Sequence, residues 1–178
     1  MSPMMKQSLT VEYALLGFLW KEPLHGYDIF NKLKDSVEFG FAWRIKKSKL
    51  YALLNKLEQN NWLERDNEME NAQSTRKYFR LTEKGRLIFL NWVKSTVDLP
   101  RDFRLIFLTK LFFLLEIDPD MANHLIKEQL ITCQTWLKNI QKNDQIESRF
   151  DKYFKSFKAY HIQSLIDWLD TCLKFGSQ

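Results

Sequence analysis

A group of cationic and small polar side chains surrounds a leucine repeat in the N-terminal half of the sequence. The repeat consists of Leu50, Leu53, Leu54 and Leu57 at helical spacing, and at 100° per residue it occupies one face of a helix. The opposite face carries Ser48, Ala52, Asn55, Lys56 and Gln59, with Tyr51 at its flank. Hydroxyl and amide groups can form hydrogen bonds with base edges in the DNA major groove. This face is therefore predicted to read double-stranded DNA.

The start of the same helix is rich in positive charge. Its approach contains Arg44, Lys46, Lys47 and Lys49. Lysines at a helix N-terminus add to the positive end of the helix dipole and favour contact with phosphate groups. We therefore expect Lys46, Lys47 and Lys49 to bind the DNA backbone.

A second basic group lies in the segment TRKYFRL, residues 75–81, which reads as the returning strand of a hairpin. Alternation sends Arg76, Tyr78 and Arg80 to one face, and Lys77 and Phe79 to the other. Contact of Arg76 and Lys77 with phosphate or the minor groove is the first interpretation. Acidic residues on the outgoing segment favour the alternative that the tip faces away from DNA: Glu64, Asp66, Glu68 and Glu70.

Residue sets for catalysis or metal binding are not found. The sequence contains no GxSxG, HExxH, GxxxxGK or GxGxxG motif. The three histidines are scattered, and Cys133 and Cys172 form no CxxC pair. His25 is interpreted as a hydrogen-bonding residue of a turn. We expect no enzymatic activity, no cofactor and no metal.

The elements that hold these side chains follow the order helix, helix, short strand, helix, hairpin, helix. Helices are predicted over about 8–19, 27–39 and 47–60, with a short strand at 42–45. Strands follow at 62–66 and 75–81, and Thr82 caps a fourth helix closed by Leu99-Pro100. Ser8 is the expected cap of the first helix, and Asn61 the expected left-handed residue after the third. This order describes a winged helix-turn-helix.

Beyond Pro100 the pattern is helical only. Residues 102–115 are apolar nearly all round, Asp118-Pro119 opens a helix reaching about 143, and a last helix spans about 149–174. The wide apolar stripes of the last two helices are expected to pair with a second copy. The candidate dimerisation residues are Phe103, Phe107, Leu111, Phe154, Phe157, His161, Leu165 and Trp168.

The fold class is therefore mainly α: a winged helix-turn-helix DNA-binding domain over 1–98, with a small β-hairpin wing, and a C-terminal helical dimerisation domain over 99–178. The net charge of +5 is concentrated in the first domain, which has 16 Lys and Arg against 12 Asp and Glu, leaving 11 against 10 in the second. This asymmetry favours a polyanionic partner for the first domain. Signal-peptide and membrane-span patterns are not found, so a cytoplasmic location without membrane association is expected. Trp92 and Trp136 are candidates for a small-molecule effector pocket; core or dimer packing is the alternative.

Three motifs resemble the PadR-like transcriptional regulators. They are the segments LHGY (24–27), KLYALLNKLE (49–58) and KYFRLTEKGR (77–86). The resemblance implies a winged-helix dimer, usually a repressor, and implies DNA contact by Tyr27, Ser48, Tyr51 and Lys56. The chain departs from the family pattern at residues 47–49 (Lys-Ser-Lys), at Asn61 and at residues 74–75 (Ser-Thr).

Sequence therefore predicts a homodimeric, sequence-specific transcriptional regulator acting on a pseudo-palindromic operator. Two recognition helices about 34 Å apart would face successive turns of the duplex. A winged-helix module that binds another protein, without reading DNA, is the alternative.

Overall fold

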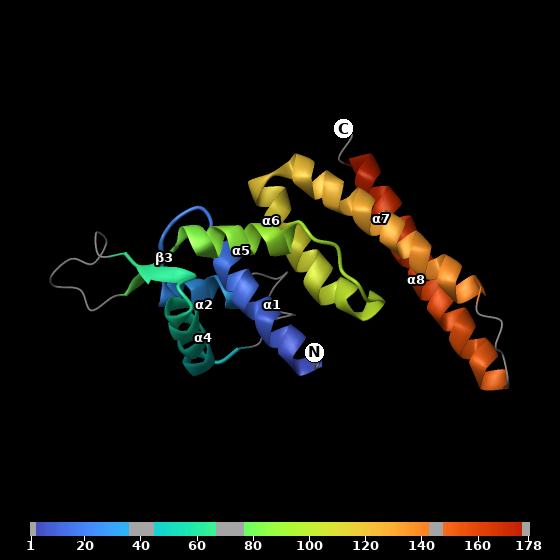
Figure 1. Cartoon of the computed structure of the whole chain (residues 1–178), viewed down its shortest axis with the longest axis horizontal. Helices are drawn as coiled ribbons and strands as arrows, with labels where there is room; N and C mark the ends of the chain where they lie inside the picture. Colours follow the sequence, from blue (N-terminus) through green and yellow to red (C-terminus); the bar gives the residue numbers. More distant parts are fainter. Residues whose placement is uncertain (1–2, 36–44, 67–76, 143–147, 176–178) are drawn as a thin grey trace. The chain divides into compact units, whose positions relative to one another are not determined.

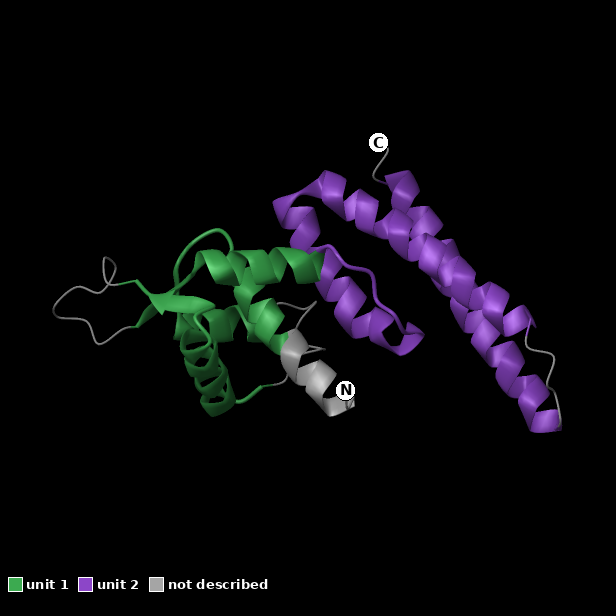
Figure 2. Ribbon diagram, in the orientation of Figure 1, with its two compact units in different colours: residues 1–93 green, residues 94–178 purple. Residues whose placement is uncertain are grey.

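The computed structural model describes residues 3–35, 45–66, 77–142 and 148–175, with the side chains described from Val11 onward. The chain divides into two compact units, unit 1 (residues 1–93) and unit 2 (residues 94–178) (Figures 1 and 2). Each unit has its own buried apolar residues. No described helix is both long enough and apolar enough to cross a membrane.

Unit 1 contains four described helices and a small sheet. The helices are α1 (Pro3–Phe18), α2 (Gly26–Asp35), α4 (Lys47–Gln59) and α5 (Glu83–Val93). Their apolar stripes meet in one core that includes Leu15, Ile29, Leu54 and Phe89, each 0% exposed. Burial of these stripes supplies the main driving force that orders the unit.

The sheet has three antiparallel strands in the order β1-β3-β2. They are β1 (Leu24–His25), β2 (Leu63–Arg65) and β3 (Tyr78–Leu81). Leu24 pairs with Phe79, and Leu63 pairs with Leu81. All four of these side chains are buried, so the sheet packs one face on the helices. Helices α2 and α4, followed by the hairpin of β2 and β3, form a winged helix-turn-helix.

Most sequence predictions for the described elements of unit 1 are confirmed, with three differences. Residues 24–25 form a strand where a turn was expected, because they pair with β3 across more than fifty residues. Helix α1 begins at Pro3, so Ser8 is not its cap, and α5 ends at Val93 before Leu99-Pro100. The expected strand at 42–45 and the end of the helix expected to reach 39 lie largely outside the described residues.

Unit 2 is helical throughout its described part. A 3-10 turn η1 (Pro100–Asp102) and a π-helical segment η2 (Phe103–Phe107) lead into α6 (Leu108–Ile117). Two long helices follow, α7 (Pro119–Lys142) and α8 (Arg149–Phe175), which run side by side (Figure 1). The Asp118 carboxylate accepts a hydrogen bond from the Met121 backbone N–H at 3.0 Å, which confirms the predicted cap of α7.

A buried amide and a buried lysine fix the segment before η1. Gln129 is fully buried, accepts a hydrogen bond from the Val97 N–H at 2.8 Å and donates one to the Val97 carbonyl at 3.3 Å. The Lys110 ammonium donates to the Ser95 carbonyl at 2.6 Å and to the Ser95 hydroxyl at 2.8 Å. These bonds satisfy polar groups that would be costly to bury alone.

Candidate nucleic-acid interface

Helix α4 separates its apolar side from its polar side as the leucine spacing predicted. Leu50, Leu53, Leu54 and Leu57 are all buried. The residues predicted to face DNA are all exposed: Ser48, Tyr51, Ala52, Asn55, Lys56 and Gln59. We call this set the outer face of α4. Among the described residues, the outer face is thus exposed while the leucine side is buried.

The lysines at the start of α4 are exposed, and one is held by aromatic rings. Lys46 occupies the N-cap position without a side-chain capping bond. The Lys47 ammonium lies 4.5 Å from the centre of the Tyr27 ring and 5.4 Å from that of Phe30. Such cation–π contacts restrict a flexible lysine. Lys47 is thus positioned beside the outer face, next to the half-exposed ring of Tyr27.

The beginning of α2 fits closely against α4. A Cβ atom at Gly26 would lie 2.8 Å from Cε1 of Tyr51, so glycine lets that ring lie against the backbone. The His25 Nδ1 atom accepts a hydrogen bond from the Tyr27 N–H at 3.2 Å, so His25 forms a local hydrogen bond as predicted, but from the end of β1 and not from a turn. The motif LHGY therefore brings the start of α2, which carries Tyr27, against the start of α4, which carries Tyr51.

Glu12 is a site residue that the sequence did not reveal. Its position lies off the apolar stripe of α1, yet its side chain is only 1% exposed. Its Oε1 atom lies 2.8 Å from the Lys56 ammonium, from which it accepts a hydrogen bond and with which it forms an ion pair. Burial, and then the Glu12 carboxylate, raise the pKa of the adjacent Tyr13. The positive charge of Lys56 on the outer face is therefore offset by the carboxylate of the buried Glu12.

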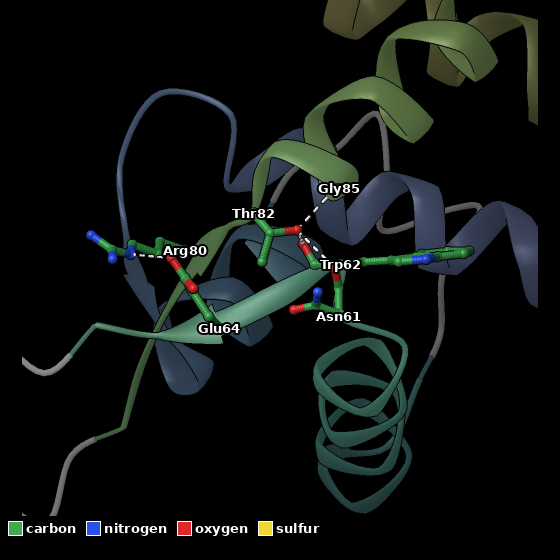
Figure 3. A network of polar contacts seen from close by, with 6 residues as sticks. All are labelled: Asn61, Trp62, Glu64, Arg80, Thr82 and Gly85. Atoms are coloured by element: carbon green, nitrogen blue, oxygen red, sulfur yellow. Dashed lines mark hydrogen bonds and ion pairs between the residues drawn. The ribbon is translucent and has the colours of Figure 1, made fainter.

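The far end of α4 is fastened to the wing and to α5 (Figure 3). Asn61 has φ of 58°, the left-handed conformation predicted for it. The Thr82 hydroxyl donates to the Asn61 carbonyl at 2.8 Å and accepts from the Gly85 N–H at 3.0 Å, so it caps α5. A side chain at Gly85 would overlap the Trp62 carbonyl, which explains the glycine there.

The base of the wing carries charge that is largely neutralised. Arg80 pairs with Glu64 at 2.8 Å across the sheet (Figure 3). Arg65 pairs with Glu58 at 2.8 Å. Lys77 is exposed, whereas Arg76 lies outside the described residues. Of the two wing residues predicted to contact DNA, Lys77 is therefore the one that the structure describes, and its side chain is exposed.

The two tryptophans proposed for an effector pocket lie in different units. In unit 1, Trp92 stacks on Tyr13 with ring centres 4.9 Å apart, and Tyr13 stacks on Trp62 at 6.1 Å. In unit 2, Trp136 is half-buried on α7. Trp92 thus contributes to an aromatic stack within unit 1. No cluster of described His, Cys, Asp or Glu side chains could hold a metal ion.

The predicted dimerisation residues divide into two groups. Phe103, Phe107 and Leu111 are buried inside unit 2, where the rings of Phe103 and Phe107 stack with centres 4.5 Å apart. Their apolar character serves the core of one chain, which the sequence pattern could not distinguish from an interface. The α8 residues Phe154, Phe157, His161 and Trp168 are exposed, and Leu165 is half-buried.

The order of helices and strands in unit 1 is that of a winged-helix module, with the outer face of α4 exposed. Residues 15–89, within this unit, match the model of the "Transcriptional regulator PadR-like family". Over these residues the chain is similar to the PadR-like family of transcriptional regulators.

One curated relative and two solved structures are also similar to this chain. The chain is 29% identical over 131 residues to the Bacillus subtilis negative transcriptional regulator PadR, covering 74% of this chain and 71% of the relative. The crystal structure of Bacillus subtilis PadR with operator DNA is 25% identical, with a TM-score of 0.45, covering 93% of this chain and 98% of that one. The same protein with p-coumaric acid gives 25% and a TM-score of 0.43, covering 95% and 99%.

Proposed function

We propose that this chain is a homodimeric repressor that binds a pseudo-palindromic DNA operator through the outer face of α4. The observation that carries the proposal is the exposure of every residue in the outer face of α4, opposite a buried leucine stripe. Ser48, Asn55 and Gln59 would contact base edges, while Lys46, Lys47 and Lys49 would contact phosphates. Tyr27 and Tyr51 flank this surface, and Lys77 supports it from the wing.

Repression and dimerisation are the finer parts of the proposal. The relative from Bacillus subtilis is named a negative transcriptional regulator, which supports repression. Two copies would pair through unit 2 and present two α4 helices to one duplex. Unit 1 would then be the DNA-binding domain and unit 2 the dimerisation domain. A protein with this role acts in the cytoplasm, where it meets chromosomal DNA.

Salt dependence of DNA binding tests the role of the lysines. Each lost phosphate contact lowers the slope of log affinity against log salt by about 0.9. The double variant Lys47→Ala/Lys49→Ala should therefore lower the slope by about 1.8 on a duplex selected from a random pool. The control is Lys138→Ala/Lys142→Ala, which removes the same charge from exposed positions of α7.

The result separates DNA binding from the alternative of a protein-binding module. An unchanged slope in the Lys47/Lys49 variant, with the α7 control equally unchanged, would contradict DNA contact by α4. Failure to enrich any duplex would favour the protein-binding module. Repression is tested by transcription from a promoter carrying the selected duplex, which should fall with the wild-type protein and not with the double variant.

A further inference from the structure

We infer that the rings of Tyr27 and Phe30 hold Lys47 in place for a phosphate contact without neutralising its charge. Tyr27 and Phe30 are thus positioning residues, which act on DNA through this lysine. The inference rests on the proposed function and deepens it, because it gives one of the three lysines at the start of α4 a larger share of the affinity. Lys47 is among the residues at which the chain departs from the PadR-like pattern, so the arrangement belongs to this chain.

Two aromatic residues of α2 lie beside the Lys47 ammonium. Tyr27 and Phe30 are three residues apart in α2, so their side chains leave that helix on the same side. The ammonium lies 4.5 Å from the centre of the Tyr27 ring and 5.4 Å from that of the Phe30 ring. Both distances are shorter than the limit of about 6 Å at which a ring attracts a cation. We call these two rings the aromatic clamp.

The packing of α2 on α4 brings the lysine to the aromatic clamp. Lys47 and Tyr51 are four residues apart in α4 and therefore lie on the same side of that helix. The Tyr51 ring lies against Gly26, the residue directly before Tyr27. The clamp is therefore part of the contact between two helices of unit 1, and it exists in the protein without DNA.

The aromatic clamp holds the cation and leaves its charge intact. An aromatic ring attracts a cation through its quadrupole and has no net charge of its own. The Lys56 ammonium, by contrast, lies 2.8 Å from the carboxylate of Glu12. Among the described residues, no carboxylate forms an ion pair with Lys47. Lys47 is therefore restrained and still able to attract a phosphate at full charge.

The restrained ammonium also keeps donors for a phosphate oxygen. An ammonium has three N–H donors, and the two rings accept none of them as an ion-pair partner would. The Lys47 side chain is exposed beside the outer face of α4. Ordering a flexible side chain on binding weakens affinity by about two- to tenfold, and the aromatic clamp has already ordered this one. Lys49 has no ring contact within the described part of the chain, so it bears that cost when it binds.

Two single variants compare the clamped lysine with the unclamped one. Lys47→Ala and Lys49→Ala each remove one phosphate contact, so each should lower the slope of log affinity against log salt by about 0.9. At about 1 M salt, where the counterion term of the linear relation vanishes, Lys47→Ala should bind the selected duplex about two- to tenfold more weakly than Lys49→Ala. Equal affinities at that salt concentration would overturn the inference, because the clamp would then add nothing.

Two substitutions of Tyr27 test the ring itself. Tyr27→Phe and Tyr27→Leu both lack the hydroxyl, so any hydroxyl contact with DNA cancels in their comparison, and only Tyr27→Phe keeps the ring. Tyr27→Leu should bind about two- to tenfold more weakly than Tyr27→Phe. In a Lys47→Met background, at low salt, the two should bind equally, since no cation remains to be held. The same ratio in both backgrounds would mean that the ring acts independently of Lys47, and it would overturn the inference.

Nuclear magnetic resonance of the free protein tests the clamp without DNA. In protein labelled with carbon-13 at the lysine Cε, the Lys47 signal should be shifted upfield by ring currents, because its ammonium lies over the Tyr27 ring. The signal is identified by its loss in Lys47→Met, and the shift should persist in Tyr27→Phe and shrink in Tyr27→Leu. A duplex that binds while the Lys47 signal is unshifted would overturn the inference and leave the proposed function intact. A shifted signal in a protein that binds no duplex would refute the proposed function alone.

Discussion

The ion pair between Glu12 and Lys56 makes a quantitative prediction about the recognition helix. The carboxylate is 1% exposed, whereas the Lys56 side chain is 53% exposed, and the two atoms are 2.8 Å apart. Removing one partner of a fully buried pair costs about 3–5 kcal/mol. An exposed pair contributes about 0–1 kcal/mol. Because Glu12 is buried and Lys56 is half-exposed, the cost should lie between these two cases. Lys56→Met should therefore lower the free energy of unfolding by about 2 kcal/mol.

A double-mutant cycle isolates this effect. Glu12→Gln removes the charge that needs compensation, so Lys56→Met should cost close to nothing in the Glu12→Gln background. Unfolding by urea, followed by circular dichroism, gives the four free energies of unfolding. Lys49→Met serves as the control because Lys49 is an exposed lysine of the same helix, and its change should stay within about 0.5 kcal/mol.

The same pair bears on DNA binding. Because the charge of Lys56 is offset by Glu12, Lys56→Met should reduce the salt slope by clearly less than the value of about 0.9 expected for a phosphate-binding lysine. The opposite outcome is a free energy of unfolding within about 0.5 kcal/mol of wild type together with a salt slope lowered by the full value of about 0.9. That result would show that the ion pair does not hold Lys56, and it would refute the reasoning.

Two further predictions concern unit 2 and the tryptophans. Burial raises the pKa of the Cys133 thiol to about 11, against 9.0 when unfolded, so the unfolded state loses a proton first and stability should fall between pH 9 and pH 11. Cys133→Ser should show a shallower fall in urea unfolding; an identical slope would contradict the assignment. Planar aromatic compounds should quench tryptophan fluorescence if Trp92 or Trp136 lines an effector site, and the corresponding Trp→Phe variant should lose that response. A flat response over a broad panel would remove both residues as candidates.

Local patterns carried most of what could be predicted. The leucine spacing of α4 determined which side chains are exposed, because one helix face must be buried. Asn61 and Thr82 could be assigned from backbone and capping chemistry alone. These features depend on residues within a few positions of each other in the sequence.

Features that depend on distant partners were missed. Leu24 and His25 form a strand only because β3 lies beside them. Glu12 is buried because Lys56, 44 residues away, meets its carboxylate. Phe103 and other apolar residues of unit 2 could equally have faced a partner, since hydrophobic character does not say which surface covers it.

The division of α4 into a leucine side and an outer face has an evolutionary consequence. The buried leucines of α4 contribute to the core, while the side chains that we propose read bases are exposed and contribute little to it. Exchanges at Ser48, Asn55 or Gln59 should therefore be nearly neutral for folding. Descendants of this protein could acquire new operator preferences by single substitutions, with Lys56 constrained by the carboxylate beneath it.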